Sequence, residues 1–291
     1  MIVSITDWIA VLPALIILGT AILVVAVDLF LKPQAGRGTL VFLSFVGLSF
    51  SAGMFIDRLR KGKVPIDAFK GSLIMDDLTA YLSLAVVAAT ALLLIGAEAD
   101  TRRRRIGFGE YYGLLLMCAA AMILLVGSND FLMVFINLEV LSLALYVLTG
   151  ITRRSPRSNE AAVKYLVTGA FATGFLLMGV AFLYGATGSF TLHGIGTWVA
   201  SNPSSPLLEV GFGLLLVGFG FKLGVVPFHM WIPDVYEGAP TTTTAFMSVT
   251  VKAAGIGALV RILLIAGAGR AELWADLLWW LAVITMIVAC G

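Results

Sequence analysis

The chain has 291 residues, of which 60% are hydrophobic and only 12% are charged, and its formal net charge is +2. Because soluble domains carry about 25% charged residues, this composition excludes an ordinary soluble enzyme and predicts an all-α polytopic membrane protein. Two cysteines are too few for the four thiolates that usually hold an iron–sulfur cluster, and no glycine-rich loop follows a predicted strand. We therefore expect no cofactor and no metal in the chain itself, and no nucleic-acid partner.

Nine apolar segments are long enough to cross a membrane, which takes about 20 residues. They are expected at 8–31, 38–56, 77–97, 111–127, 130–150, 161–185, 207–231, 241–266 and 273–291. The first segment lacks the basic leader of a cleavable signal peptide and is long enough to span. The connections 57–76, of mixed charge, and 187–206, rich in Gly, Ser, Asn and Pro, are predicted to be loops.

The distribution of Lys and Arg predicts the orientation, because cytoplasmic loops carry the excess. The odd-numbered loops carry Lys32, Arg37, Arg102 to Arg105, Arg153, Arg154 and Arg157, whereas the fourth and sixth loops carry none. The second loop is an exception, with basic residues that four aspartates partly offset. The balance predicts an N-terminus outside and odd loops in the cytoplasm, in a multi-pass protein of a bacterial inner membrane or, as the alternative, of an organelle.

The last apolar segment runs to Gly291 without a polar cap or a basic tail. A span that stops inside the membrane is unusual, because transmembrane segments end in polar, interfacial residues. We therefore expect the sequence to be part of a longer chain.

Lys222 lies at the centre of the seventh segment, five residues before Pro227. A charge at the bilayer centre costs about 2.5–3.5 kcal/mol on insertion scales, so it marks a functional site by default. Pro227 has no N–H for the carbonyl of Leu223, so we expect the helix to break near Pro227 and to loosen within one turn of Lys222. Broken helices at membrane depth line cavities or sites. The segment predicts transport of protons or other cations.

Three more ionisable residues lie inside predicted spans: Glu139 and Lys252 at the centres of the fifth and eighth segments, and Lys164 about one turn into the sixth. A lysine in hydrocarbon is disfavoured in its charged form, and a nearby carboxylate restores that form. A Glu–Lys pair whose separation changes is therefore a proton switch. We predict a proton relay of Glu139, Lys222, Lys252 and Lys164, with His229 as a weaker member.

Each assignment has a purely structural alternative. Lys164 could extend its ammonium to the interface, and Glu139 could be a static partner that only helps the helices to pack. His229 could be a satisfied polar residue at the helix break. Gly220 and Gly224 have the small-xxx-small spacing of close helix packing.

A long motif carries a family resemblance. The run Phe221-Lys-Leu-Gly-Val-Val-Pro-Phe-His-Met-Trp-Ile-Pro-Asp-Val-Tyr-Glu-Gly-Ala-Pro-Thr241, followed by Phe246-Met-Ser-Val-Thr-Val-Lys252, resembles the antiporter-like membrane subunits of NADH:quinone oxidoreductase, respiratory complex I. The Pro-Asp-Val-Tyr-Glu-Gly-Ala-Pro version is similar to the group called subunit N or subunit 2. Asn137-Leu-Glu139 and Glu160-Ala-Ala-Val-Lys164 also match, so the resemblance covers about residue 110 to the end.

The resemblance implies a fourteen-helix fold with two inverted five-helix repeats, each holding one broken helix. Residues 1–110 would be an N-terminal three-helix segment, 111–266 the first repeat with a proton half-channel, and 267–291 the incomplete start of the second. The family's glutamate and lysines on the fifth to eighth helices match Glu139, Lys164, Lys222 and Lys252 here.

The resemblance also implies an activity: a non-redox subunit that couples quinone reduction to proton pumping. NADH, FMN, iron–sulfur clusters and quinone would then bind other subunits, and the neighbours would be subunits M, L, K, J and A and membrane lipid. The alternative is a subunit of a multi-chain sodium/proton antiporter, which shares the Lys-x4-Pro-x-His-x-Trp pattern. The Asp234-Val-Tyr-Glu-Gly stretch favours the first reading.

Overall fold

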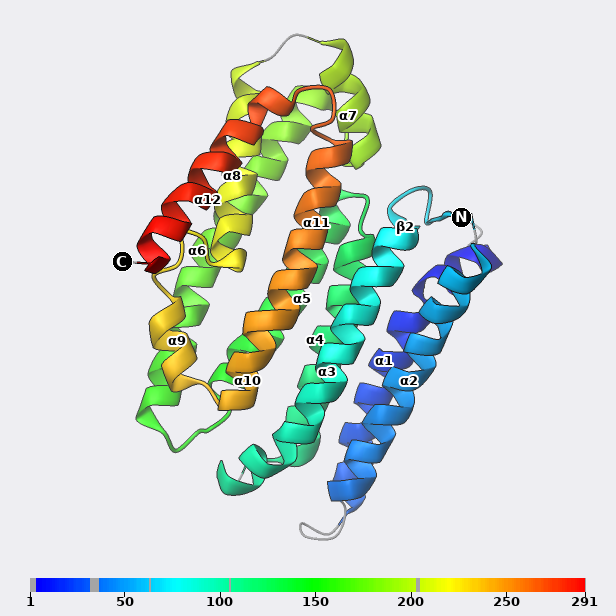
Figure 1. The fold of residues 1–291 in the computed structure, drawn as a ribbon, viewed down its shortest axis with the longest axis vertical. Coiled ribbons are helices and arrows are strands. Elements are labelled where there is room, and N and C mark those ends of the chain that lie inside the picture. The colour runs from blue at the N-terminus through cyan, green and yellow to red at the C-terminus, as the bar shows by residue number, and fades with distance from the viewer. Residues whose placement is uncertain (1–3, 32–36, 63, 105, 203–204, 291) are drawn as a thin grey trace.

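Long helices that run roughly parallel to one another make up the structure (Figure 1). It is a computed structural model and describes residues 4–31, 37–62, 64–104, 106–202 and 205–290. Within those ranges, eight helical segments are long and apolar enough to cross a membrane, and a further apolar helix near the end is shorter. The prediction of an all-α polytopic membrane protein is therefore confirmed.

The membrane helices lie at the predicted segments. They are α1 (Ile5–Phe30), α2 (Arg37–Lys61), α3 (Asp77–Arg104), α4 (Phe108–Gly127), α5 (Phe131–Thr149), α6 (Pro156–Thr187), α8 (Pro206–Leu223), and one span made of α10 (Thr241–Phe246), a π-helical turn (Met247–Val251) and α11 (Lys252–Ile265). However, α2, α3 and α6 extend five to seven residues beyond the predicted bounds, and α8 ends eight residues before its predicted end. The remaining elements are β1 (Ile66–Ala68), β2 (Leu73–Met75), α7 (Leu192–Ser201), α9 (Ile232–Gly238), a 3-10 turn (Ala271–Leu273) and α12 (Ala275–Cys290).

Several helices begin at residue types that satisfy free backbone N–H groups. Side-chain oxygens of Ser4, Asp130, Ser155 and Ser205 accept hydrogen bonds from backbone N–H groups at the starts of α1, α5, α6 and α8. In α6 and α8 a proline follows the cap, where its fixed φ suits the first helical turn. The short polar connections between the apolar segments therefore supply the N-terminal caps of these helices.

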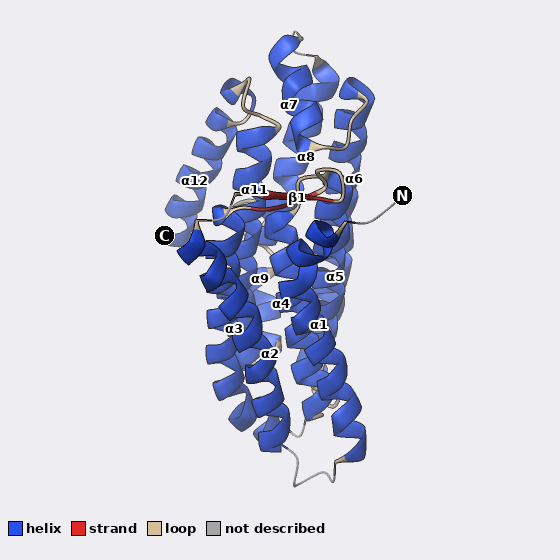
Figure 2. Cartoon of the chain, turned by 90° about the vertical axis from the view of Figure 1, so that its right-hand side faces the viewer, coloured by secondary structure: helices blue, strands red, loops and turns tan. Residues whose placement is uncertain are grey.

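Two connections predicted as loops contain regular structure, so that part of the prediction is wrong. Within 187–206, α7 buries Leu192, Ile195 and Val199, whose spacing is that of an amphipathic helix. Within 57–76, β1 and β2 pair antiparallel in a hairpin that lies across the helix axes (Figure 2). Turn-forming and charged residues dominate both stretches in composition and hide the few apolar positions that are buried.

The connections alternate between the two ends of the bundle, as the sequence predicts. At one end, backbone bridges join the hairpin, the α4–α5 connection and the start of α7. At the other end, the ion pair Arg153–Glu110 joins the α5–α6 connection to α4, and Arg157–Glu237 joins the start of α6 to α9. Which of these ends faces the cytoplasm stays a prediction from the distribution of Lys and Arg.

Helix α4 is the most enclosed of the eight spans: 78% of its most apolar stretch is buried, against 33% for α2 and α6. It contacts α1, α3, α5 and α11. The outer faces of α2 and α6 expose large apolar side chains such as Phe42, Phe50 and Phe171. In a membrane protein such faces meet lipid or neighbouring helices, so α4 lies at the centre of the bundle and α2 and α6 at its edges.

A buried arginine that the sequence prediction missed ties α11 to its neighbours α3 and α4. Arg261 is 3% exposed, and its guanidinium donates two hydrogen bonds to the Asp76 carboxylate, at 2.7 and 2.9 Å. It also donates to the Thr79 hydroxyl and the Val126 carbonyl, both at 2.9 Å. Two parallel bonds between a guanidinium and a carboxylate fix geometry as well as charge. One end of α11 is thereby held to the start of α3 and the end of α4.

The opposite end of the same span is also attached to α3. The Thr242 hydroxyl donates to the Asp100 carboxylate at 3.2 Å and lies 2.6 Å from the Tyr111 hydroxyl of α4. The π-helical turn Met247–Val251 lies between the two attachments. Helix α3 therefore holds both ends of the span that carries Lys252.

Candidate functional site

Helix α8 ends inside the bundle, one residue after Lys222. Gly224 has a left-handed φ of 74°. Its N–H bonds back to Phe221 at 3.1 Å, and the N–H of Val225 bonds to Gly220 at 3.0 Å. These two bonds form a Schellman motif, in which glycine is favoured because a Cβ is strained at such a φ.

The predicted break is confirmed in its position, but its predicted cause is wrong. Gly224 ends the helix three residues before Pro227, so the proline follows a helix that has already stopped. Gly224 also lies outside the helix, which contradicts its predicted part in a small-xxx-small packing face. The Gly-x-x-x-Gly pattern was misleading because Gly224 is needed for the left-handed backbone conformation that ends α8, and not for close packing between helices.

Two side chains also donate hydrogen bonds to backbone carbonyl groups at the end of α8. The Lys252 ammonium donates to the Leu223 carbonyl at 2.5 Å, and the Trp231 indole donates to the Phe221 carbonyl at 3.0 Å. A cation at a helix C-terminus is favourable because the partial negative charges of the last carbonyls attract it. The break therefore brings Lys252 of α11 to the end of the helix that carries Lys222.

Lys222 is 7% exposed and has only neutral groups as its direct partners among the described residues. Its ammonium donates to the Ser142 hydroxyl of α5 at 2.8 Å and lies 5.9 Å from the centre of the Tyr165 ring of α6. A cation over an aromatic ring is attracted to the ring face. A buried charge without a counter-ion in contact is costly. Loss of the Lys222 proton, or the approach of a carboxylate to its ammonium, would each relieve that cost.

Glu139 supplies that carboxylate in the same cavity, one helical turn from Ser142. Its Oε1 accepts a hydrogen bond from the Thr173 hydroxyl at 2.7 Å, and it forms no ion pair with any described residue. Glu139, Thr173, Ser142 and Lys222 all line a cavity that leaves about 20 Å³ for the centre of a water molecule. One water needs about 10–15 Å³ on this measure. The Glu–Lys pair is therefore open, with a hydroxyl on each partner and room for water between them.

Lys164 belongs to a different, more exposed site. Its ammonium lies 2.8 Å from both Glu160 and Asp234, and its side chain is 43% exposed. Because α6 begins at Pro156, Lys164 lies about two turns into the helix and not one as predicted. The structure therefore does not place it in the Glu139 cavity, and its relay role stays a prediction.

An aromatic cluster connects the two polar sites. The ring of Tyr165 stacks on Trp231 with 4.6 Å between centroids and meets Tyr146 edge-on at 4.8 Å. Trp231 also packs against Phe221 and Tyr236. The Tyr236 hydroxyl is buried without a hydrogen-bond partner among the described residues, and burial raises its pKa to about 12. These rings were not predicted as site residues, although Tyr165 lies beside the Lys222 ammonium and Tyr146 lines the cavity that holds Glu139 and Lys222.

His229 lies between α8 and α9, in the irregular segment that follows the break. It is half-buried, and its Nδ1 has no hydrogen-bond partner in the described part of the chain. A buried polar atom without a partner is uncommon in native proteins and points to water or to a second state. Its weaker relay role stays a prediction.

Replacing Gly224 with alanine is expected to destabilise the protein by about 1–2 kcal/mol, the cost of a left-handed conformation for a residue with a Cβ. The added Cβ would contact Ile232 and lie 3.2 Å from the Lys252 ammonium. Thermal unfolding of the purified protein measures the change. Gly213→Ala is the matched control, because Gly213 lies within α8 with open space around it. Equal stability of the two variants would contradict the role of Gly224 as the helix terminator.

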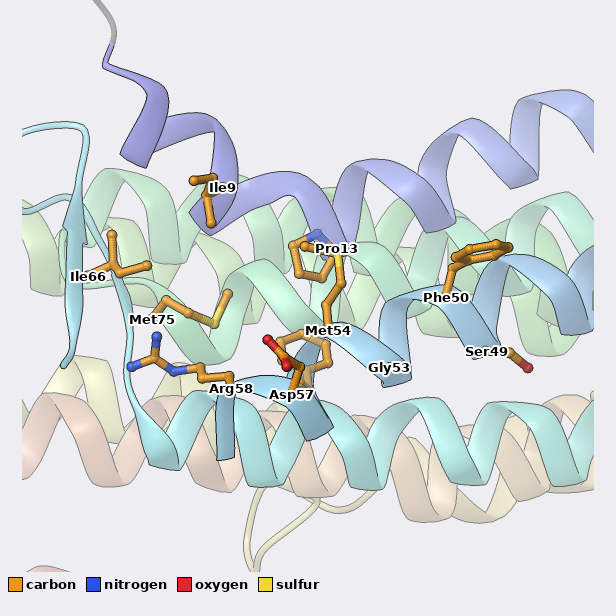
Figure 3. Close-up of a pocket in the computed structure, with 11 residues that line it drawn as sticks. Ile9, Pro13, Ser49, Phe50, Gly53, Met54, Asp57, Arg58, Ile66 and Met75 are labelled. Carbon is orange, nitrogen blue, oxygen red and sulfur yellow. The ribbon is translucent and has the colours of Figure 1, made fainter. Parts of the chain in front are cut away.

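A further cavity lies apart from these residues. It encloses about 530 Å³ between α1, α2 and the hairpin, and Figure 3 shows Asp57 and Arg58 beside apolar side chains such as Pro13 and Met54. None of the predicted relay residues is among the described residues that line it. It is therefore not part of the candidate site around Lys222.

Comparison with known proteins gives a family match over more than half of the chain. A family model described as "NADH:quinone oxidoreductase/Mrp antiporter, TM" matches residues 128–291. This stretch begins at the α4–α5 connection and contains Glu139, Lys164, Lys222, His229 and Lys252. The match therefore covers every residue predicted for the relay.

Individual relatives agree with the family match. The chain is 39% identical over 274 residues to the protein named NADH-quinone oxidoreductase subunit N of Trichlorobacter lovleyi, an alignment that covers 94% of this chain and 55% of the relative. A solved structure of respiratory complex I from Thermus thermophilus contains a chain with 34% identity and a TM-score of 0.71, over 86% of this chain and 52% of that one. A chain of the Mrp complex from a Dietzia species, 23% identical with a TM-score of 0.75 over 92% and 50%, shares the fold. The chain spans about half the length of the relatives it matches.

Proposed function

We propose that this chain, which belongs to the NADH:quinone oxidoreductase/Mrp antiporter transmembrane family, is part of a proton-translocating membrane subunit of NADH:quinone oxidoreductase. The relatives named subunit N, at 36–47% identity, favour the subunit N type. The fold alone fits an antiporter subunit equally well, since the Mrp chain shares it. Sequence identity, and not the fold, therefore supports the complex I reading over the antiporter reading.

The observation that carries the proposal is the open Glu139–Lys222 pair at the end of a broken helix. Lys222 keeps its proton when a carboxylate approaches and releases it when the carboxylate withdraws, because burial disfavours the isolated ammonium. In the present arrangement, Ser142 and Thr173 hold the two groups separately. A shift of α5 against α8 that closes the pair would load Lys222, and the reverse shift would release its proton.

Lys252 is the proposed acceptor of the proton that leaves Lys222. Leu223, the last residue of α8, follows Lys222 in the chain, and its carbonyl accepts a hydrogen bond from Lys252. Proton transfer from the Lys222 ammonium leaves a neutral amine there and requires a neutral amine at Lys252. The exposed cluster of Lys164 and Asp234 is the proposed site of proton uptake, with His229 as a weaker member.

The wider assignment rests on the same family relation. We propose that the chain holds no redox group, that NADH, FMN, iron–sulfur clusters and quinone bind other subunits, and that the neighbours are subunits M, L, K, J and A of the complex. We further propose an inner-membrane location with the N-terminus outside, and an organisation into 1–110, a first repeat over 111–266, and the start of a second repeat over 267–291. The Lys and Arg distribution supports the orientation, and the break in α8 supports the repeat.

Glu139→Gln, introduced into the whole complex, is expected to lower NADH-driven proton transport about tenfold or more. The reason is that a nearby carboxylate favours the charged form of a lysine and raises its pKa by roughly one to three. Oxidation of NADH by an artificial electron acceptor should be unchanged. Acidification of inverted membrane vesicles measures the transport. Glu272→Gln, at an exposed glutamate outside the spans, is the matched control. Full transport by an assembled Glu139→Gln complex would overturn the proposal.

The energy source separates the proposal from the antiporter alternative. Proton transport that depends on NADH oxidation and ignores an imposed sodium gradient supports the complex I reading. Proton transport that a sodium gradient drives in the absence of NADH supports a multi-chain sodium/proton antiporter and contradicts the proposal.

A further inference from the structure

An open groove on the side of the bundle has no part in the proposed relay. It encloses about 720 Å³ between α1, α4 and α5, which lie side by side (Figure 2). Its lining includes large apolar side chains that are strongly exposed: Ile22 (64%), Leu29 (80%) and Val147 (56%). An exposed apolar hollow in a membrane span excludes water and is filled by hydrocarbon or by another helix.

The length of the groove matches one leaflet of a bilayer. Along α1 it runs from Leu18 to Leu29, which is about 16 Å at 1.5 Å per residue. Half of a bilayer's hydrocarbon thickness is about 15 Å. The groove ends at the connection that precedes α6, where the polar residues begin. A single acyl chain of ordinary length therefore fits from the interface to the bilayer centre.

The mouth of the groove carries two opposite charges side by side. Arg153 and Glu110 approach to 3.5 Å, with side chains that are 81% and 60% exposed. An exposed pair of this kind contributes little stability, so either partner can exchange it for another. A guanidinium binds phosphate in a forked geometry, and a carboxylate accepts hydrogen bonds from an ammonium group. Phosphate and ammonium together are the headgroup of phosphatidylethanolamine.

We propose that this groove binds one phosphatidylethanolamine molecule, with its phosphate on Arg153, its ammonium on Glu110 and one acyl chain along α1. The binding does not depend on the proton-pumping role. Its consequence for the relay follows from Tyr146, which lines both this groove and the cavity that holds Glu139 and Lys222. The bound chain would pack against the outer side of that shared wall and keep water on the relay side.

Photo-crosslinking in the assembled complex tests the proposal. The complex is reconstituted in nanodiscs that contain phosphatidylethanolamine with a diazirine in its acyl chain, and the labelled peptides are identified by mass spectrometry. Label is expected on 18–29, 113–117 and 146–151. Ala26→Phe fills the groove and should reduce this label on the order of fivefold or more, the loss expected when a close-packed site is blocked. Leu23→Phe, on an exposed face of α1 away from the groove, should leave it unchanged.

Headgroup variants give a second readout that the packing of the groove does not affect. Arg153→Gln should weaken labelling by phosphatidylethanolamine and by phosphatidylglycerol about two- to fivefold, as for a partly exposed charge pair. Glu110→Gln should weaken only the former. Equal label in Ala26→Phe and the unmodified complex, a preference for phosphatidylglycerol, or cross-linking of a photoreactive residue at Val147 to a protein chain would each overturn the proposal.

Discussion

Lys222→Ala, introduced into the whole complex, is expected to cut NADH-driven proton transport on the order of 100-fold while NADH oxidation by an artificial acceptor continues. Among the described residues that line the Glu139 cavity, Lys222 is the one that carries an ammonium, and the variant removes it. A proton must then cross that part of the membrane without a stabilised position, at a cost of about 2.5–3.5 kcal/mol, which corresponds to roughly two orders of magnitude in rate. Vesicle acidification reports the transport, and ferricyanide reduction by NADH reports the peripheral reaction.

Lys222→Arg separates proton exchange from a fixed positive charge. Arginine keeps the charge and the hydrogen bond to Ser142, but it does not release its proton in proteins. We expect an assembled complex with transport nearly as low as in Lys222→Ala. Lys61→Ala, which removes an exposed lysine at the end of α2, is the matched control and should pump normally. Normal pumping by Lys222→Arg would show that Lys222 is a structural cation and that the relay is wrong.

Asp76→Ala is expected to cost about 3–5 kcal/mol of stability, because it leaves the Arg261 guanidinium buried without a counter-ion. The Arg261 side chain is 3% exposed, whereas that of Asp76 is 23% exposed. The reverse change, Arg261→Leu, should cost less, since Asp76 can be hydrated once its partner is gone. Thermal unfolding of the purified protein compares the two variants.

A double variant and the pH dependence complete this test. Asp76→Ala combined with Arg261→Leu should be more stable than Asp76→Ala alone, because it removes the isolated charge. Burial alone raises the pKa of Asp76, but hydrogen bonds from Arg261 and Thr79 and the charge of Arg261 hold the pKa below its ordinary value of 3.8. The pair therefore stabilises the fold above that value, and its contribution is lost as the pH falls through the lower, folded-state pKa. A stability gap between the unmodified protein and Asp76→Ala that stays constant down to acid pH would contradict this account.

The spans could be predicted from the sequence because lipid imposes a strict rule. Every backbone group at membrane depth must bond within its own segment, so a long apolar run becomes a helix. No such rule holds in the connections, where α7 and the hairpin depend on a few apolar residues that pack against the bundle. This is why eight of the nine predicted spans were confirmed among the described residues, the ninth being a shorter apolar helix, and why the two predicted loops were wrong.

The candidate site shows the same division. Glu139, Lys222 and Lys252 stand out in the sequence because a charge in an apolar run is costly. Their partners do not stand out, since Ser142 is 80 positions from Lys222 and Leu223 is 29 from Lys252. The separation of Glu139 from Lys222 depends on how the helices pack against one another, and a local sequence pattern cannot predict it.

Arg261 was missed although its signal was of the same kind. It lies in the apolar run Ala258-Leu-Val-Arg261-Ile-Leu-Leu, where a charge is as unusual as at Lys252. Its partner Asp76 is 185 positions away, at the start of a helix that reads as a loop boundary. A count of every charge within the predicted spans would have found it, whereas its structural role follows only from the contact with α3.

The wide π-helical turn Met247–Val251 sets the rotational phase of the span on either side of it. Thr242 and Arg261 are 19 positions apart, which in an unbroken α-helix is about five turns plus a further 100°. A π-helical turn absorbs one extra residue, so the offset falls to about five whole turns and both side chains point the same way. Both in fact reach α3, at Asp100 and Asp76. If the same residues formed regular α-helix in place of this turn, one of the two attachments would swing away from its partner by about 100°, however well every other contact were preserved.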